Sequence, residues 1–308
     1  MQAIGPVPPH SHALVGSSDG SLIVSSPNGK TVTRIDAATG QVLSTQDLGR
    51  GGALSAVEID RSVWIVQQAR PDAPRLLQLD ARTLAIQGER EYDSIAEGIA
   101  AADGHVWLGT GHILTEIDPV SGRTIDRFPL LGGINLVAGD ADSSLVFVTL
   151  EGPVRKDRSP LLEIDGSTGD VLASARAGYA DLGGVSHLAP APNGVWVGEP
   201  TGMMGTLGFY ATDGLMGLVP PRGFDEGKDG HGVIYGANSI TGAYAGSHLW
   251  VAYGEGTVTC ADARTGRTLG TLTDGSPAGS ADIVTVGGQP MTIVDSTLYA
   301  IDEQIACS

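Results

Sequence analysis

Aromatic residues and positive charge are both scarce in this chain. Phe, Trp and Tyr make up 5% of its 308 residues, and 18 Lys and Arg face 35 Asp and Glu, a formal net charge of −17. An acidic surface repels nucleic acid and anionic membranes, and so few aromatic rings offer little for stacking bases. We therefore expect no nucleic-acid partner.

Long apolar runs and a secretory leader are also missing from the sequence. No stretch approaches the ~18 apolar residues that a membrane-spanning helix needs, so we expect no membrane span in this chain. The opening residues, MQAIGPVPPH, have neither the basic nor the apolar region of a signal peptide. Either the protein is cytoplasmic, or an export or anchor segment is absent from this chain. Residues 1–11 are predicted to form an N-terminal arm.

Turn-forming and apolar residues are plentiful instead. The chain has 45 Gly and 17 Pro, yet 41% of its residues are hydrophobic, which is enough to bury a sizeable core. No segment shows a sustained apolar period of 3.6 residues, so helices should be scarce. The composition favours many short strands joined by tight turns.

A repeated phrase with Asp and Thr-Gly divides the chain into seven units. It reads IDAATGQVL at 35–43, IDPVSGRTI at 117–125, IDGSTGDVL at 164–172 and ADARTGRTL at 261–269, with weaker copies at 79–86, 209–216 and 301–306. Its first polar positions lie 38 to 52 residues apart: Asp36, Asp80, Asp118, Asp165, Tyr210, Asp262 and Asp302. Seven copies at this spacing are hard to obtain by chance.

A short apolar strand precedes each copy of the phrase, as in VWIV at 63–66 and LWVA at 249–252. Before it lies a Gly/Ala-rich strand that ends in a hairpin turn such as Asp103-Gly104. Each unit therefore has four antiparallel strands, and the sequence predicts an all-β fold: a seven-bladed β-propeller of four-stranded antiparallel blades over residues 12–308. The Trp residues that recur at one strand position should wedge between blades: Trp64, Trp107, Trp196 and Trp250.

The phrase Asp-x-x-Thr-Gly-x-x-Leu resembles the repeat of YncE-like and PQQ-like β-propellers, and the resemblance covers nearly the whole chain. Quinoprotein dehydrogenases of this type place a docking Trp shortly after the Gly, where this chain has pairs such as Leu43-Ser44 and Leu172-Ala173. PQQ is therefore unlikely, and no cofactor is predicted. The stretches 195–205 and 249–266 look like secreted or membrane-anchored actinobacterial propeller proteins, which implies an extracytoplasmic location.

Polar residues that open the first strand of each unit should ring the mouth of the central channel: Ser55, Glu97, Asn135, His187, Asn238 and Asp282. Glu97, His187 and Asp282 are the candidate catalytic residues, since such groups activate water or hold a metal. The alternative is that the ring only binds channel water. The chain has no nucleophile elbow, His-Glu-x-x-His or P-loop.

Irregular connections should gather on the rim opposite the repeated turns, which is where function concentrates on a rigid scaffold. Arg70, Arg75 and Arg155 lie in two of them and could attract an anionic ligand, unless they are only solvated hairpin tips. Met203 offers an adaptable apolar contact. The longest connection, 219–239, is either a lid or a site for a divalent cation. Its candidate metal ligands are Asp225, Asp229 and His231. The other candidate ligand-binding residues are Asp225, Tyr235, Asn238 and, at the channel mouth, Asn135.

Cys260 and Cys307 are the only cysteines. The last unit lacks its Thr-Gly hairpin, so its final strand should fray, and a disulfide to the neighbouring unit would hold it. We predict that bridge, which also favours an oxidising compartment. Two unpaired thiols in a cytoplasmic protein are the alternative.

Two functions of different class remain open. The first is an extracytoplasmic sensor or scaffold that binds a small-molecule ligand or a protein partner at the irregular rim. The second is a propeller enzyme of lyase, hydrolase or isomerase type, with a polar and possibly metal-assisted site at the channel mouth. The absence of a recognisable nucleophile, base and orienting group favours binding.

Overall fold

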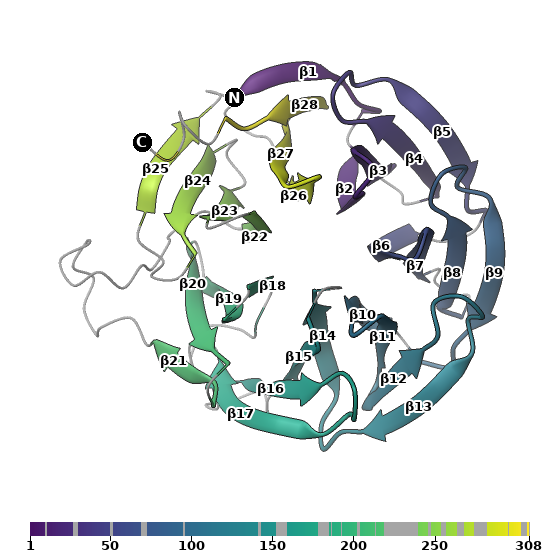
Figure 1. The fold of residues 1–308 in the computed structure, drawn as a ribbon, viewed down its shortest axis with the longest axis vertical. Coiled ribbons are helices and arrows are strands. Elements are labelled where there is room, and N and C mark those ends of the chain that lie inside the picture. The colour runs from purple at the N-terminus through teal and green to yellow at the C-terminus, as the bar shows by residue number, and fades with distance from the viewer. Residues whose placement is uncertain are drawn as a thin grey trace.

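The computed structural model describes the chain outside residues 10, 27–29, 50–51, 69–72, 95, 141–142, 152–158, 178–184, 186, 192, 202–203, 213, 219–239, 246–247, 254–256, 264–267, 274–281, 295, 303–306 and 308. Its regular elements are 28 strands, and the described residues form no helix. The strands make seven separate four-stranded sheets. Figure 1 shows them as blades around a central channel, so the predicted seven-bladed β-propeller is confirmed.

The blades follow one another along the chain, with the innermost strand of each coming first. Blade one holds β2 (His12–Gly16), β3 (Ser21–Ser25), β4 (Thr31–Asp36) and β5 (Val42–Asp47). Blade two holds β6 (Gly52–Ile59), β7 (Ser62–Gln68), β8 (Arg75–Asp80) and β9 (Ile86–Glu91). Blade three holds β10 (Ala96–Ala102), β11 (His105–Thr110), β12 (Ile113–Ile117) and β13 (Thr124–Pro129). Blade four holds β14 (Ile134–Gly139), β15 (Leu145–Leu150), β16 (Ser159–Asp165) and β17 (Val171–Ala177).

The remaining three blades complete the ring. Blade five holds β18 (His187–Ala191), β19 (Gly194–Thr201), β20 (Met204–Ala211) and β21 (Met216–Leu218). Blade six holds β22 (Ile240–Ala245), β23 (His248–Tyr253), β24 (Thr257–Asp262) and β25 (Thr268–Thr273). Blade seven holds β26 (Asp282–Val286), β27 (Gln289–Val294), β28 (Thr297–Ala300) and, as its outermost strand, β1 (Gln2–Pro6).

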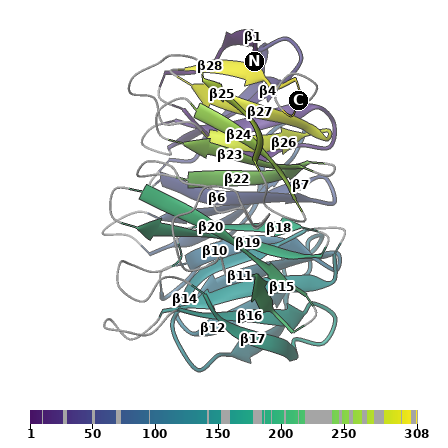
Figure 2. The same ribbon diagram turned by 90° about the vertical axis from the view of Figure 1, so that its left-hand side faces the viewer.

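Backbone hydrogen bonds between the connections define two rims of the disc (Figure 2). On the turn rim, the turn after the third strand of a blade bonds the turn after its first strand, as in Ala37 N to Gly20 O, 3.1 Å. On the irregular rim, the segment that leaves a blade bonds the connection between its second and third strands, as in Leu130 N to His112 O, 2.8 Å. The predicted sorting of the connections onto two rims is thus visible in the hydrogen bonds.

The repeated Asp closes the turn between the third and fourth strands. In blade one, Asp36 Oδ1 accepts hydrogen bonds from the hydroxyl and the backbone N–H of Thr39, both at 2.8 Å. These bonds, the hydroxyl first, hold the pKa of Asp36 below its usual value. Equivalent Ser or Thr bonds lower the pKa of three further turn residues: Asp80, Asp118 and Asp165. The repeated phrase is therefore a turn signature.

The third residue of each second strand wedges into the interface with the next blade. Trp64 packs with Ile99 and Leu108 of blade three, and Trp196 packs with Leu249 and Val251 of blade six. The set comprises Ile23, Trp64, Trp107, Phe147, Trp196, Trp250 and Met291. The predicted wedging of the four Trp residues is confirmed, and burial of such rings contributes much of the interface stability.

Two constraints favour glycine at the last position of the repeated turn. Gly122 has φ of +67°, where L side chains are rare, and a Cβ there would lie 3.3 Å from the Trp64 ring of the previous blade. In blade two the same turn position holds Leu84 at φ +61°, and its side chain is fully buried between blades one and two. Burial there offsets the backbone strain that a non-glycine residue incurs.

Blade seven is completed by the other end of the chain. We expected residues 1–11 to form an arm, but Gln2–Pro6 is β1, which pairs antiparallel with β28 from Gln2 opposite Ala300 to Pro6 opposite Thr297. The pairing supplies the fourth strand that the shortened last unit lacks. It also covers the edge of β28, which otherwise has unpaired N–H and C=O groups. The run of Pro and Gly near this strand hid it from sequence reasoning.

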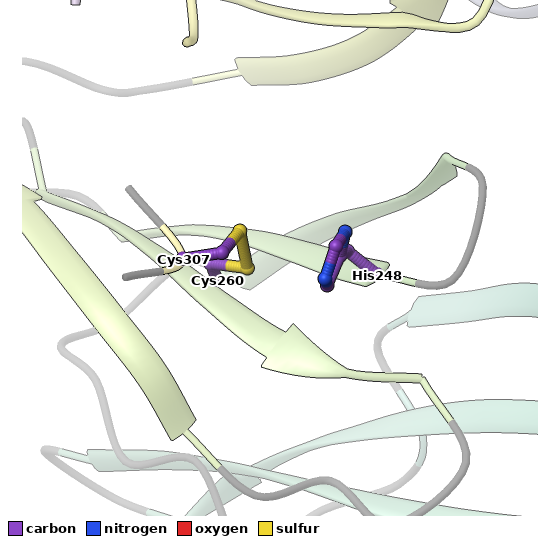
Figure 3. Close-up of side chains that lie close together, drawn as sticks. All are labelled: His248, Cys260 and Cys307. Atoms are coloured by element: carbon purple, nitrogen blue, oxygen red, sulfur yellow. A yellow bond between two sulfur atoms is a disulfide. The ribbon is translucent and has the colours of Figure 1, made fainter. Parts of the chain in front are cut away.

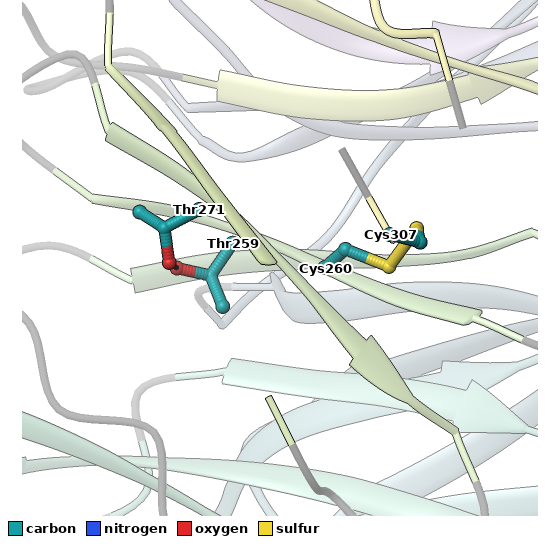
Figure 4. Close-up of a disulfide and its surroundings, with 4 residues drawn as sticks. All are labelled: Thr259, Cys260, Thr271 and Cys307. Atoms are coloured by element: carbon teal, nitrogen blue, oxygen red, sulfur yellow. Dashed lines mark hydrogen bonds between the residues drawn. A yellow bond between two sulfur atoms is a disulfide. The ribbon is translucent and has the colours of Figure 1, made fainter. Parts of the chain in front are cut away.

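The predicted disulfide is confirmed and links the C-terminal segment to blade six. Cys260 on β24 bonds Cys307, with Cα atoms 5.6 Å apart (Figure 4). Cys260 belongs to the hydrophobic cluster between blades six and seven. The hydroxyl of the preceding residue, Thr259, lies 3.2 Å from the hydroxyl of Thr271 on the neighbouring strand β25. The bridge therefore fastens the chain beyond the last strand across an interblade interface.

Replacing both cysteines with serine should lower the free energy of unfolding by about 4 kcal/mol, because the bridge closes 47 positions of the unfolded chain. Urea unfolding under non-reducing conditions measures this. Reduced wild type should unfold at the same urea concentration as the double variant, and a gap between them would show that the serine side chains, not only the loss of the bridge, change the stability.

Trp196→Phe should destabilise the protein more than Trp64→Phe, by about 1–3 kcal/mol. Trp196 Nε1 donates to the Ala263 carbonyl of the next blade at 3.1 Å, so Phe leaves a buried acceptor unpaired. Among the described residues, no atom accepts a hydrogen bond from Trp64 Nε1. Both Trp side chains are buried, so the two substitutions remove a similar area of buried surface. Equal losses in denaturant unfolding would show that the Trp196 bond adds nothing.

Candidate functional site

Three neighbouring inner strands bulge at one position of the channel mouth. The register shifts between Ala53 and Ser55 on β6, between Ala96 and Gly98 on β10, and between Ile134 and Leu136 on β14. The extra residues are Leu54, Glu97 and Asn135, which follow one another around the ring in blades two, three and four. Bulges redirect side chains and disrupt strand pairing, and they are frequent beside active sites.

The bulges lie on the irregular-rim side of the channel, because the inner strands enter from that rim. The inner strand of blade one shifts two residue pairs deeper, between Ala13 and Val15. The strands β18, β22 and β26 of blades five to seven pair without a shift over their described residues. The same bulge thus occurs in three successive blades and is absent from blade six, where Ile240 and Thr241 pair in step with Tyr253 and Ala252. In β18 and β26 the equivalent step lies beyond the described pairs.

The bulge residues have different surroundings. The Asn135 side chain is half-buried, and its Nδ2 donates to the Val185 carbonyl at 2.8 Å, which joins blade four to the segment entering blade five. Leu54 stays 54% exposed at the same position of blade two. The sequence placed Ser55 in this ring, whereas the strand register makes Leu54 the equivalent of Glu97 and Asn135.

The three candidate catalytic residues do not lie on neighbouring strands. Glu97 is on β10 of blade three, His187 opens β18 of blade five, and Asp282 opens β26 of blade seven. An intervening blade separates each from the next, since contacts between inner strands join successive blades. Among the side chains that the structure describes, no metal-ligating group of three forms at the channel mouth.

Arg75 is held inside the interface between blades one and two. Its guanidinium donates to the Leu48 carbonyl at 2.9 Å, to Glu89 Oε1 at 2.6 Å and to Gln67 Oε1. Arg75 and Gln67 are buried, and Glu89 is partly exposed. The residue that the sequence marked as a ligand-binding cation is therefore a clamp that joins the connections of the irregular rim.

Several other predicted site residues lie outside the described residues: Arg70, Arg155, Met203, Asp225, Asp229, His231, Tyr235 and Asn238. They remain predictions, as does the choice between a lid and a cation site for 219–239.

The irregular rim exposes an apolar residue that sequence reasoning missed. Leu131, in the connection from β13 to β14, is 107% exposed, as open as in an extended chain. The connection is held to its own blade by Leu130 N to His112 O and by Ile134 N to Gly111 O at 2.5 Å. The sequence signal was the pair Leu130-Leu131 before Gly132-Gly133, where only the first leucine packs inward.

The turn rim holds polar contacts of a different kind. Ser17 Oγ of blade one donates to Glu58 Oε1 of blade two at 2.8 Å, and partial burial raises the pKa of Glu58. In blade three, His105 Nδ1 lies 3.0 Å from Glu116 Oε1, and burial raises the pKa of Glu116. These contacts pair residues of adjacent strands or blades, so we assign them to the scaffold.

Comparison with known proteins shows the fold alone. The chain matches no protein-family model. It also matches no curated protein. The Pan2 WD40 domain of Neurospora crassa is similar with a TM-score of 0.67 and 10% identity, over 96% of this chain and 88% of that one.

Two further solved structures are similar over most of the chain. BamB from Moraxella catarrhalis has a TM-score of 0.59 and 13% identity, over 94% of this chain and 83% of that one. The computationally designed Ika8 protein has a TM-score of 0.65 and 16% identity, over 98% of this chain and all of that one. The described part of this chain contains no helix that is long and apolar enough to span a membrane.

Arg75→Ala should lower the free energy of unfolding by on the order of 3 kcal/mol, because it leaves the buried Gln67 Oε1 and the Leu48 carbonyl without the hydrogen bonds that Arg75 donates. Glu89→Gln is the matched control and should cost less than about 1 kcal/mol, since that carboxylate is partly exposed. Guanidinium unfolding compares the two. An Arg75→Ala protein as stable as wild type would show that these hydrogen bonds contribute nothing to the free energy of unfolding.

Proposed function

We propose that the protein is an extracytoplasmic binding propeller, of sensor or scaffold type, that engages a protein partner through its irregular rim over blades two to four. The resemblance of the repeats to YncE-like propellers and the fold shared with BamB and the Pan2 WD40 domain are consistent with this role. The proposal itself depends on the geometry of the rim.

The observation that carries the proposal is the run of bulges at Leu54, Glu97 and Asn135, with Leu131 on the connection between the second and third of them. A blade has no structural need to bulge at this step, because β22 of blade six pairs through it without a shift. The bulges give the channel mouth over blades two to four a backbone shape that blade six lacks.

A protein partner fits this surface better than a small molecule. Leu131 projects fully into solvent, and Leu54 is more than half exposed at the channel mouth. Apolar side chains that protrude from a polar surface act as anchors for a pocket on another protein. A small-molecule site instead encloses most of its ligand in a concave pocket.

The location is supported by the disulfide and by the charge. Disulfides persist in oxidising compartments, and Cys260–Cys307 is well within the usual Cα separation. The net charge of −17 disfavours contact with anionic lipid or nucleic acid, which leaves proteins with neutral or basic surfaces as the expected partners.

Leu131→Asp should weaken partner binding by at least about tenfold, the loss of a single apolar anchor. The experiment immobilises wild type through its C-terminus, identifies proteins retained from the extracytoplasmic fraction of the source cell, and measures the affinity of each purified candidate. Leu54→Asp should act in the same direction.

Val120→Asp is the matched control, because Val120 is 75% exposed but lies in a turn of the turn rim. All three variants should unfold within about 0.5 kcal/mol of wild type, as surface changes usually do. The proposal fails if no protein distinguishes Leu131→Asp from Val120→Asp.

A further inference from the structure

Two cysteines and a histidine meet where the C-terminal segment joins blade six. One ring nitrogen of His248 and the sulfur atoms of Cys260 and Cys307 all lie within 4.8 Å of one another. Figure 3 shows the imidazole beside the sulfur–sulfur bond, with all three side chains on one face of the sheet. Imidazole and thiolate are the two ligand types that zinc prefers in proteins.

The sheet fixes two of these groups. His248 opens β23, Cys260 lies on the adjacent β24, and the register sets Trp250 opposite Cys260 and Asp262 opposite His248. His248 and Cys260 are thus diagonal neighbours on one face, the arrangement that brings long side chains into reach. The Trp250 ring meets the imidazole edge-on, with centroids 6.2 Å apart, and restricts its orientation.

Cys307 supplies the third group, and the exposure of the three side chains also suits a metal site. Cys260 is fully buried, whereas His248 and Cys307 are partly exposed, so an ion could reach the cluster from solvent. Bond lengths of about 2.3 Å to sulfur and 2.0 Å to nitrogen place tetrahedral zinc ligands roughly 3.5–3.8 Å apart. Opening the sulfur–sulfur bond lets the two sulfur atoms move apart to that spacing, and the His248 nitrogen already lies within 4.8 Å of both.

We propose that the reduced protein binds one Zn²⁺ through the thiolates of Cys260 and Cys307 and the imidazole of His248, so that the disulfide and the metal are alternative fasteners of the C-terminal segment. Three protein ligands leave a fourth position for water, the pattern of an open zinc site. This proposal is independent of the partner-binding role of the irregular rim, which lies on the other side of the disc.

The exchange between the two states balances. A dithiol reductant gives two electrons and two protons to the Cys260–Cys307 bond and becomes a disulfide itself. Zn²⁺ then displaces the two thiol protons, which are released to solvent. In the reverse direction, a small disulfide oxidises the two thiolates and takes up two protons to become two thiols. The protein bridge reforms, and one Zn²⁺ is released.

The test uses the full chain, reduced without oxygen by a phosphine and freed of reductant. Titration with Zn²⁺ should load one ion per reduced chain and none per oxidised chain. Both thiols should become protected from alkylation as zinc binds. Co²⁺ in place of Zn²⁺ should give the thiolate charge-transfer and tetrahedral d–d absorption bands of a site with sulfur ligands.

His248→Ala should weaken Zn²⁺ binding by at least about tenfold, since even outer-shell partners of a metal site are worth that much. His105→Ala is the matched control, because His105 opens the second strand of blade three as His248 opens that of blade six. Cys307→Ser should abolish protection of Cys260. Equal zinc affinity in His248→Ala and wild type would reduce the site to two thiols and overturn the proposal.

Circular dichroism covers the case in which reduction unfolds the chain. Zinc should then restore the strand spectrum of wild type and of His105→Ala, but not of His248→Ala. The proposal is wrong if the reduced wild type keeps its fold and binds no zinc, or if zinc fails to restore a fold that reduction has removed.

Discussion

Each blade of this propeller buries both of its faces against its neighbours, and the hydrophobic clusters of the described residues all lie between successive blades. The interfaces depend on the residue at the third position of every second strand, which inserts into the next blade whether it is Trp, Phe, Ile or Met. A blade without its neighbour would leave such a side chain in water, so the stability of the ring depends on closure. That requirement explains the glycine of the repeated turn, which lies against the Trp64 ring in the neighbouring blade.

Closure is achieved at blade seven by two different means. The strand β1 supplies the outer edge of the last sheet, and the disulfide fastens the chain beyond β28 to blade six. The first acts through backbone hydrogen bonds in the folded state, and the second limits the freedom of the unfolded chain. If the second is replaced by a bound ion under reducing conditions, ring closure responds to the redox state of the surroundings.

Much of the fold could be predicted because it depends on interactions between residues that are close in the sequence. The Asp side chain that closes each turn and the apolar second strand recur at fixed spacing, so seven sheets follow from the residues. The role of Gln2–Pro6 could not be predicted, because its partner β28 lies at the far end of the chain and QAIGP has no strand periodicity. The disulfide was found because only two cysteines exist.

The candidate site was less accessible to sequence reasoning. Arg75 looked like a ligand-binding cation because its partners Gln67 and Leu48 are contributed by a strand and by another blade, which no local pattern reveals. Leu54 had no sequence signal, and the signal for Leu131, two leucines before two glycines, does not tell which leucine is exposed. An apolar residue is expected in the core until its surroundings are known. Asn135 was expected at the channel mouth and lies near the start of the inner strand β14, whereas its bond to Val185 depends on how two blades meet.

Both chain ends lie on one side of the ring, with consequences for how the molecule can be tethered. Met1 and Cys307 pack against the same interblade cluster, and N and C appear close together in Figure 1. β1 starts opposite Ala300, next to the turn rim, and runs toward the irregular rim. A lipid, a resin or a fused domain attached at either end would therefore leave from beside blades six and seven. The mouth of the channel over blades two to four would point away from the support, open to whatever approaches from solution.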